Sequence, residues 1–355
     1  MDLESLGWNT FFEENFLPYS QKGYQIGRIA VEHKHIYRVY TAQGEILANV
    51  SGKLRYQALG KQEFPVVGDW VVLTLRLEEG RATIHAVLPR KSKFSRKAAG
   101  AVIEEQLVAS NIDNVFLVTA LNNDFNLRRI ERYLTLAWES GASPVIVLSK
   151  ADLCQNIEER VAQVESIAWG VPIHVISSIK GEGLDSLSSY LTRGKTIALL
   201  GSSGAGKSTI INQIMGKEIQ KVQEIREKDD RGKHTTTYRE MIILPQGSLV
   251  IDTPGMRELQ LWDDQDGFNE TFDDVQSYAR QCRFNDCQHQ NEPGCAVRKA
   301  LAEGQLDHLR YESYLKLQKE LAYLSRKTNQ REFLAEKEKW KKIHKEIKQI
   351  KKSKY

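Results

Sequence analysis

The chain has 355 residues, too many for one ordinary hydrophobic core, so its length predicts two or three domains. Hydrophobic residues make up 41% and charged residues 27%, which is typical of globular proteins, and the formal net charge is +4. No stretch approaches the roughly 18 uninterrupted apolar residues of a membrane span, and the start of the chain lacks a signal-peptide core. We therefore expect a cytoplasmic protein with reduced cysteines and no membrane partner.

Residues 24–90 carry short strand-like runs separated by turn signals, such as YQIGRIAV, HIYRVYT and RATIHAVL. Frequent glycine turns and the lack of a long helical period favour a small closed β-barrel of the oligonucleotide-binding (OB) type. A barrel with a merely structural role fits the same pattern. In this interpretation residues 1–23 are an N-terminal extension, and residues 91–112, which include a basic stretch, are a linker.

Residues 113–262 show a different pattern, in which short apolar runs are separated by helical stretches such as LRRIERYLTLAWES. The runs are NVFLVTA, PVIVLSK, IHVISS, TIALLGSSG and SLVIDTPG. Strands buried on both faces have this composition in parallel α/β sheets. Because ligands bind at the carboxyl ends of such strands, the motifs that follow these runs are predicted to share one edge of the sheet.

The strongest motif is GSSGAGKST, which fits the phosphate-loop pattern G-x-x-x-x-G-K-[ST] between a predicted strand and a predicted helix. Glycines let backbone N–H groups surround the phosphates, and the N-terminus of the helix favours their negative charge. Lys207 should reach the β- and γ-phosphates, and the Ser208 hydroxyl should ligate Mg²⁺. A glycine-rich turn without nucleotide is the alternative. The residues expected to contact the nucleotide here are Gly201, Ser202, Ser203, Gly204, Ala205, Gly206, Lys207, Ser208 and Thr209.

The tetrapeptide DTPG ends a further apolar run. Its Asp252 would hold Mg²⁺ through water, and the Gly255 N–H would contact the γ-phosphate. Alone, this pattern also describes an ordinary Pro-Gly turn. Between the phosphate loop and this motif lies RGKHTTTYRE, in which Thr236 is the candidate to complete the Mg²⁺ shell.

A base-reading pattern, Ser149-Lys150-Ala151-Asp152, follows the apolar run VIVL. The Asp152 carboxylate can accept hydrogen bonds from the ring N–H and the amino group of guanine, a pair of donors that adenine lacks. Lys150 would lie along the ring face. After the next strand, Ser177 and Ser178 would offer a backbone N–H to the guanine carbonyl. A Lys-x-Asp turn after a strand is common, but Asp152 disfavours the alternative of a P-loop ATPase.

The base-reading loop precedes the phosphate loop in this chain, whereas the usual order is the reverse. A binding site is defined in space, so a sheet can keep its site when the old termini are joined and new termini open at exposed loops. The order of the motifs therefore predicts a circularly permuted domain that binds GTP and GDP.

Four potential metal ligands lie close together in CRFNDCQHQNEPGC, at Cys282, Cys287, His289 and Cys295. Three thiolates and one imidazole suit a closed tetrahedral structural zinc site, with no position left for water. Incidental cysteines or a disulfide are the alternatives. We expect a helical zinc-binding domain over residues 263–330.

Together the predicted barrel, the motif order SKAD, GSSGAGKST, GKHTTT, DTPG and the Cys-x4-Cys-x-His-x5-Cys cluster resemble the RsgA family. Members of this family are circularly permuted GTPases of bacterial small-ribosomal-subunit biogenesis, and the resemblance covers about residues 20–320. It implies that the barrel and the zinc domain contact the small subunit and its rRNA. It also implies that the subunit stimulates GTP hydrolysis, after which the protein leaves.

We expect a monomer that holds one structural Zn²⁺ and binds Mg²⁺ with GTP. An RNA-binding checkpoint module for which GTP is only a regulatory ligand is the alternative function.

Two positions depart from the common GTPase pattern. Ser149 stands where Asn is commonest and its amide braces the loop, so guanine preference should survive through Asp152 at a lower affinity. Met256 follows DTPG where many GTPases have a water-orienting Gln, so intrinsic hydrolysis should be slow. His234 is the candidate to position the attacking water, and with Lys207 it completes the predicted catalytic residues. An exposed loop histidine without a catalytic role is the alternative.

Residues 331–355 form a lysine-rich tail, with nine lysines against two glutamates in residues 337–355. Trp340, Ile343, Ile347 and Ile350 recur at helical spacing and form an apolar stripe. This pattern predicts either an RNA-contacting helix with a steep salt dependence or a solvated helix whose stripe packs on the protein.

Overall fold

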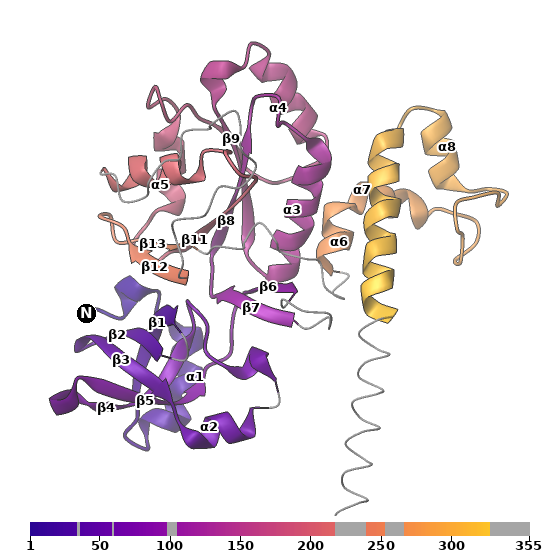
Figure 1. Ribbon diagram of the computed structural model, residues 1–355. Coiled ribbons are helices and arrows are strands. Elements are labelled where there is room, and N and C mark those ends of the chain that lie inside the picture. Colours follow the sequence, from indigo (N-terminus) through magenta and orange to yellow (C-terminus); the bar gives the residue numbers. More distant parts are fainter. Residues whose placement is uncertain (34–35, 59, 98–104, 217–238, 253–265, 327–355) are drawn as a thin grey trace, which may run out of the picture. The chain divides into compact units, whose positions relative to one another are not determined.

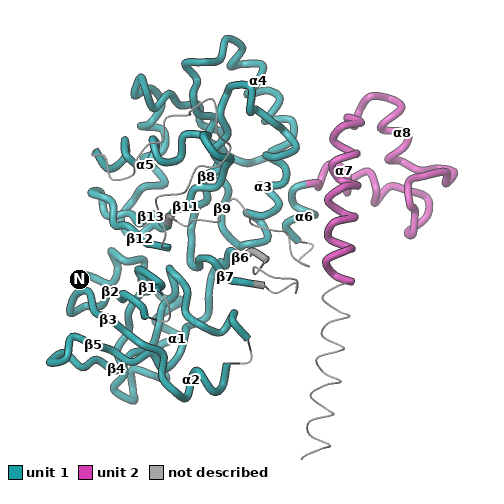
Figure 2. The backbone as a smooth tube through the Cα atoms, viewed as in Figure 1, with its two compact units in different colours: residues 1–98, 104–260, 266–271 teal, residues 99–103, 261–265, 272–355 magenta. Residues whose placement is uncertain are grey.

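The computed structural model describes residues 1–33, 36–58, 60–97, 105–216, 239–252 and 266–326. The chain divides into two compact units, which Figure 2 shows in different colours. The first comprises residues 1–98, 104–260 and 266–271, and the second comprises residues 99–103, 261–265 and 272–355.

Five strands near the N-terminus form a closed barrel, as the sequence predicts (Figure 1). They pair in the order β1-β2-β3-β5-β4, and a further pairing between β1 and β4 closes the ring. Buried and non-buried side chains alternate along β3. Ile46, Ala48 and Val50 are buried while their neighbours are not, so one face of this strand lines the interior of the barrel. The strands are β1 (Gln25–His33), β2 (Ile36–Thr41), β3 (Gly44–Val50), β4 (Trp70–Arg76) and β5 (Arg81–Val87), with α2 (Gly52–Gln57) after β3.

The N-terminal helix α1 (Thr10–Ser20) packs aromatic side chains against the barrel. Asn9 caps it by accepting a hydrogen bond from the Phe11 N–H at 3.2 Å. The ring centroids of Trp8 and Phe12 lie 4.8 Å and 5.8 Å from that of Trp70, which is fully buried. The N-terminal extension therefore contributes buried side chains, Leu6 and Phe12, to the core of this region.

Replacing Phe12 by alanine should lower the free energy of unfolding by about 3 kcal/mol, because the side chain is 2% exposed and leaves a cavity beside Trp70. Leu17→Ala is the matched control on the same helix, since Leu17 is 56% exposed and should change stability by less than about 0.5 kcal/mol. Chemical denaturation of both variants measures the difference. Equal losses would contradict the packing of α1 on the barrel.

A buried arginine links the barrel to the segments around it. The Arg28 guanidinium donates hydrogen bonds to the carbonyl oxygens of Leu6, Gly68 and Asn111. Burial lowers the pKa of Arg28 to about 10, although the charge of Asp113 opposes this shift. The guanidinium therefore stays charged at neutral pH and satisfies three buried carbonyl groups.

The segment interpreted as a linker, residues 91–112, contains two paired strands, β6 (Lys93–Lys97) and β7 (Glu105–Ser110). Phe94 and Leu107 are buried, at 2% and 3% exposure. These apolar side chains explain why a stretch rich in basic residues is ordered as a strand pair.

The predicted α/β sheet is present in the order β10-β9-β8-β11-β13-β12, and only the β12–β13 pair is antiparallel. Helix α3 contacts β8 and β9 on one face of the sheet, and α5 lies on the opposite face (Figure 1). Phe116 and Val118 of β8 belong to the same buried cluster as Ile210 and Ile211 of α5. The elements are β8 (Asn114–Ala120), α3 (Leu127–Ser140), β9 (Ser143–Ser149), α4 (Ile157–Glu165), β10 (Ile173–Val175), β11 (Thr196–Leu200), α5 (Lys207–Met215), β12 (Arg239–Ile243) and β13 (Leu249–Asp252).

Strand β12 joins the α/β sheet to the barrel, so the two form one continuous sheet of eleven strands. Its residue Glu240 pairs with Val31 of β1 in antiparallel register. Two ion pairs flank this junction, Arg239 with Glu32 at 3.1 Å and Glu240 with Arg38 at 2.5 Å. The strand was not predicted from the sequence.

The described part of the second unit is helical. It contains α7 (Asp273–Ala279), α8 (Ala296–Ala302) and a helical stretch over residues 308–326, whereas α6 (Asp266–Thr271) packs on α3 in the first unit. Arg310 pairs with Asp274 at 3.0 Å and lies over the Phe272 ring. In the part of the chain that the structure describes, no helix is long and apolar enough to span a membrane.

Candidate functional site

The parallel strands bring the predicted base and phosphate loops to one edge of the sheet. Ser149 is the last residue of β9, and Lys150–Asp152 follow it. Ser177 and Ser178 come shortly after β10, and residues 201–206 connect β11 to α5. Because all these loops leave carboxyl ends of parallel strands, residues far apart in sequence become neighbours.

The phosphate loop requires glycine at two positions. A Cβ on Gly201 would lie 2.3 Å from the Val118 carbonyl oxygen of β8, and Gly206 has a φ of +95° immediately before α5. The Lys207 ammonium donates hydrogen bonds to the carbonyl oxygens of Gly201 at 2.8 Å and Ser202 at 2.6 Å. Its positive charge therefore lies over the first turn of the loop.

Ser149 connects the base loop to the phosphate loop. Its side chain is 1% exposed, and its hydroxyl donates to the Ala205 carbonyl oxygen at 2.6 Å. Asn is the commonest residue at this position, where its amide braces the base-reading loop, and this chain has Ser instead. The serine hydroxyl makes a direct bond to the phosphate loop, so a brace is present despite the substitution.

A second serine orients the aspartate of the base loop. The buried Ser177 hydroxyl donates to Asp152 Oδ1 at 2.6 Å, and the Ala151 N–H donates to the Ile176 carbonyl oxygen at 3.1 Å. Lys150 adopts a left-handed conformation, with φ of +59°, which is uncommon outside glycine. These contacts hold the tetrapeptide against the end of β10, with one Asp152 oxygen fixed in place.

One residue of this edge was not identified from the sequence. Asp124 follows β8, and its carboxylate accepts hydrogen bonds from the Ser202 hydroxyl and from Arg129 at 2.7 Å. The sequence did offer a signal for Asp124. It is a polar residue shortly after a strand of the α/β sheet, and polar residues at the carboxyl ends of such strands, Ser149 among them, are candidates for the ligand site. Without a motif around it, the acid in LNNDFN did not stand out.

Not all predicted site residues fall within the part of the chain that the structure describes. His234, Thr236, Gly255 and Met256 lie outside the described residues, as does the lysine-rich tail. Asp252 is the last residue of β13, which places its backbone at the same edge as the phosphate loop. Ser208 and Thr209 lie in the first turn of α5.

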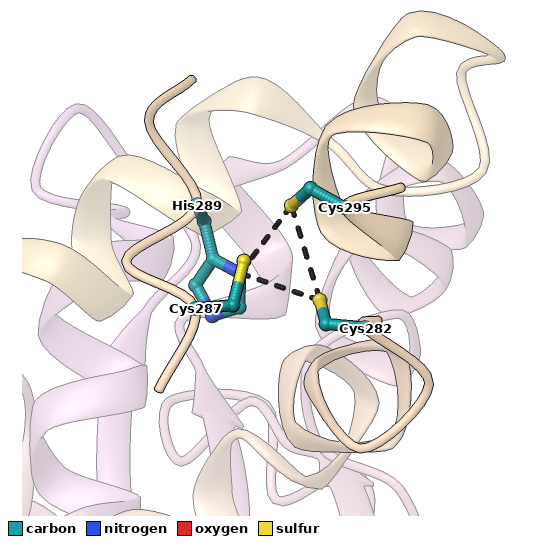
Figure 3. Close-up of side chains that lie close together, drawn as sticks. All are labelled: Cys282, Cys287, His289 and Cys295. Atoms are coloured by element: carbon teal, nitrogen blue, oxygen red, sulfur yellow. Dashed lines mark hydrogen bonds between the residues drawn. The ribbon is translucent and has the colours of Figure 1, made fainter. Parts of the chain in front are cut away.

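The predicted metal ligands converge in the second unit (Figure 3). The ligand atoms of Cys282, Cys287, His289 and Cys295 all lie within 4.8 Å of one another. The sulfur atoms of Cys282 and Cys295 are 3.9 Å apart, and His289 Nδ1 lies 3.6 Å and 3.4 Å from them. Sulfur atoms about 2.3 Å from a tetrahedral metal ion would be about 3.8 Å apart. The four side chains can therefore hold one metal ion.

The electrostatics of the cluster favour metal-binding forms of two ligands. Burial would raise the pKa of the Cys282 thiol, but hydrogen bonds from the backbone N–H groups of Val297 and Ala296 at the start of α8, together with those from Cys295 and Cys287, lower this pKa. Burial lowers the pKa of His289, so its imidazole is neutral at pH 7. These two shifts are toward the forms that bind metal, a thiolate and a neutral imidazole, whereas burial raises the pKa of the Cys287 thiol to about 11.

Two family models match the chain. The model described as RsgA GTPase matches residues 87–262, and the model described as ABC transporter matches residues 184–353. The second range contains the phosphate loop, a motif that many nucleotide-hydrolysing proteins share. The small ribosomal subunit biogenesis GTPase RsgA of Opitutus terrae is 48% identical over 353 residues, covering 97% of this chain and 96% of that protein.

The chain belongs to the RsgA GTPase family. Small ribosomal subunit biogenesis GTPase RsgA 2 of Lactiplantibacillus plantarum is also 48% identical, over 85% of each chain. Membership in the RsgA family establishes this chain as a GTP hydrolase and confirms the predicted activity.

Solved structures agree with the family assignment. YjeQ from Thermotoga maritima matches this RsgA family member with a TM-score of 0.64 at 30% identity, covering 84% of this chain and 99% of that one. YloQ, described as a circularly permuted GTPase, has the same fold, with a TM-score of 0.59 at 23% identity and coverage of 84% and 95%. The predicted combination of barrel, permuted GTPase domain and helical region with a Cys3His cluster is thereby confirmed.

Proposed function

We propose that this RsgA family member acts in late maturation of the small ribosomal subunit, where it binds rRNA and hydrolyses GTP to trigger its own release. The observation that carries the guanine site is the hydrogen bond from Ser149 to Ala205, which joins base-reading and phosphate-binding loops at one sheet edge. The names of the relatives supply the ribosomal context. In this proposal the protein works as a cytoplasmic monomer.

Each loop has a proposed role toward GTP. The two oxygens of the Asp152 carboxylate accept from the guanine ring N–H and amino group, while the Ser177 hydroxyl orients the carboxylate through Oδ1. Backbone N–H groups of residues 201–206 hold the phosphates, and Lys207 neutralises their charge. Ser208 and Thr236 ligate Mg²⁺, with Asp252 acting through water and Gly255 contacting the γ-phosphate. His234 positions the attacking water.

The domains have separate proposed tasks. Residues 113–262 bind and hydrolyse GTP, and residues 24–90 and 263–330 contact the subunit. We assign Zn²⁺ to the Cys3His cluster, because closed sets of thiolate and imidazole ligands are characteristic of structural zinc.

A cavity of about 790 Å³ on the barrel supports the proposed contact with rRNA. Tyr19, Tyr24 and His85 line it together with Lys22 and Lys53. Burial and the charge of Lys53 lower the pKa of His85, so the ring is neutral at pH 7. Aromatic rings offer stacking surfaces for unpaired bases, and lysines at the same site attract phosphates.

Steady-state GTP turnover with and without purified small ribosomal subunits tests the proposal. We expect stimulation of at least about tenfold, because contact with the subunit would complete the water-positioning geometry. Large subunits are the control for non-specific RNA effects. An absence of stimulation while GTP binding remains tight would contradict the proposal and favour the RNA-binding checkpoint module.

A further inference from the structure

Asp124 lies where it can control the shape of the phosphate loop. It follows β8, which is hydrogen-bonded to β11, the strand that leads into the loop. Its Oδ2 accepts hydrogen bonds from the hydroxyl of Ser202, the second residue of the loop, and from Arg129 Nη1 at 2.7 Å. The Lys207 ammonium is bonded to the carbonyl oxygen of the same Ser202. Ser202 therefore donates to the Asp124 carboxylate through its side chain and accepts from Lys207 at its backbone.

The position of Asp124 is itself fixed by local structure. Its backbone N–H donates to Asn122 Oδ1 at 3.0 Å. Asn126 caps α3 by accepting from the Arg129 N–H at 3.1 Å, so Arg129 projects from the first turn of a long, packed helix. The Arg129 guanidinium therefore projects from a packed helix, and the Asp124 carboxylate lies in the turn between β8 and α3, where Asn122 holds its backbone.

The charge of Asp124 strengthens the bond to Ser202 without repelling phosphate. Burial would raise the pKa of Asp124, but hydrogen bonds from Arg129 and Ser202 and the charges of Arg129 and Lys150 outweigh it and lower this pKa. The group is therefore ionised at neutral pH, and a hydrogen bond to an ionised acceptor is about twice as strong as a neutral one. The ion pair with Arg129 neutralises the negative charge beside the phosphate site.

We propose that Asp124 is a positioning residue for nucleotide binding, which holds Ser202 so that the phosphate loop is already in its binding conformation. This proposal rests on the proposed guanine-nucleotide site. Asp124 acts through Ser202 and makes no contact with the nucleotide itself. Its contribution is preorganisation, because a loop that is already ordered loses less conformational entropy when phosphate binds.

Calorimetric titration of GDP into the full-length protein tests this role. We expect Asp124→Ala to weaken GDP binding about 10- to 100-fold, because it removes a charge-assisted bond. Asp124→Asn keeps an acceptor for Ser202 but loses the charge, so its loss should be smaller. Ser202→Ala should weaken binding comparably to Asp124→Ala, and the double variant should be no weaker than the more affected single variant. Additive losses would overturn the coupling through Ser202.

Asp113→Asn is the matched control. Asp113 immediately precedes β8, whereas Asp124 follows it, so the two acids lie at opposite ends of the same strand. The Asp113 side chain is about as exposed as that of Asp124, and it accepts a hydrogen bond from the Thr196 N–H at 2.8 Å. We expect this control variant to leave GDP affinity unchanged. The loss caused by Asp124→Ala should shrink for GMP, which lacks the β-phosphate. If the wild-type protein binds GDP and Asp124→Ala binds it equally well, the positioning role of Asp124 is refuted while the proposed guanine-nucleotide site stands. If wild-type protein binds no guanine nucleotide, the proposed site fails as well.

Discussion

Replacing Asp152 by asparagine is expected to lower GTP affinity by at least about 100-fold and to let xanthosine triphosphate compete. The carboxylate accepts two hydrogen bonds from guanine in the proposed site, and each bond to a charged group contributes about 1.5–3 kcal/mol. An asparagine amide instead presents a donor where guanine also has a donor. Xanthine carries a carbonyl oxygen at that position and can accept the bond, so base preference should change along with affinity.

Competition of GTP and xanthosine triphosphate against labelled GDP measures both effects. Asp185→Asn is the control, because it removes an exposed acid of the same domain that lies in the 3-10 segment Leu184–Tyr190. That variant should bind both nucleotides as the wild type does. Unchanged GTP affinity in Asp152→Asn would refute the assigned role of this tetrapeptide.

Replacing Cys287 by serine should abolish zinc binding at the Cys3His cluster and reduce subunit-stimulated GTP turnover by at least about tenfold, while GTP affinity stays within about twofold. Structural zinc stabilises small modules by about 10 kcal/mol or more, so the second unit should lose its order without the metal. The base and phosphate loops belong to the first unit and keep their mutual hydrogen bonds.

Elemental analysis for zinc, nucleotide titration and turnover with subunits separate these effects. Cys154→Ser is the matched control, since Cys154 is a free cysteine outside the cluster. Zinc retained at full occupancy in Cys287→Ser would exclude the cluster as the metal site. Equal losses of GTP affinity and of stimulated turnover would mean that the metal supports the GTPase domain itself rather than contact with the subunit.

Local patterns in the sequence were sufficient for much of the fold. The helical stretch LRRIERYLTLAWES coincides with α3, and the runs NVFLVTA and TIALL coincide with β8 and β11. Such elements are predictable because burial on one or two faces sets a periodicity that neighbouring residues reveal. The phosphate loop and the Cys3His cluster were predictable for a related reason, since their functional groups lie within a few residues of one another.

Contacts between distant segments were not predictable in this way. The hydrogen bonds from Ser149 to Ala205 and from Ser202 to Asp124 join residues that are 56 and 78 positions apart. No periodicity encodes such pairs, because they depend on which strands are neighbours in the sheet and on how far each loop extends. The same holds for β12, whose pairing with β1 depends on the order of the strands.

The sequence by itself determined the class of each domain, the order of the predicted GTP-binding motifs and which four side chains form the Cys3His cluster. Only the tertiary structure decided that Ser149 braces the phosphate loop, that Asp124 lies against it, and that α1 completes the core of the barrel. The physical reason is the range of the interactions. Hydrophobic periodicity and turn chemistry act along the chain, whereas packing and hydrogen bonds between loops act through space and depend on the complete fold.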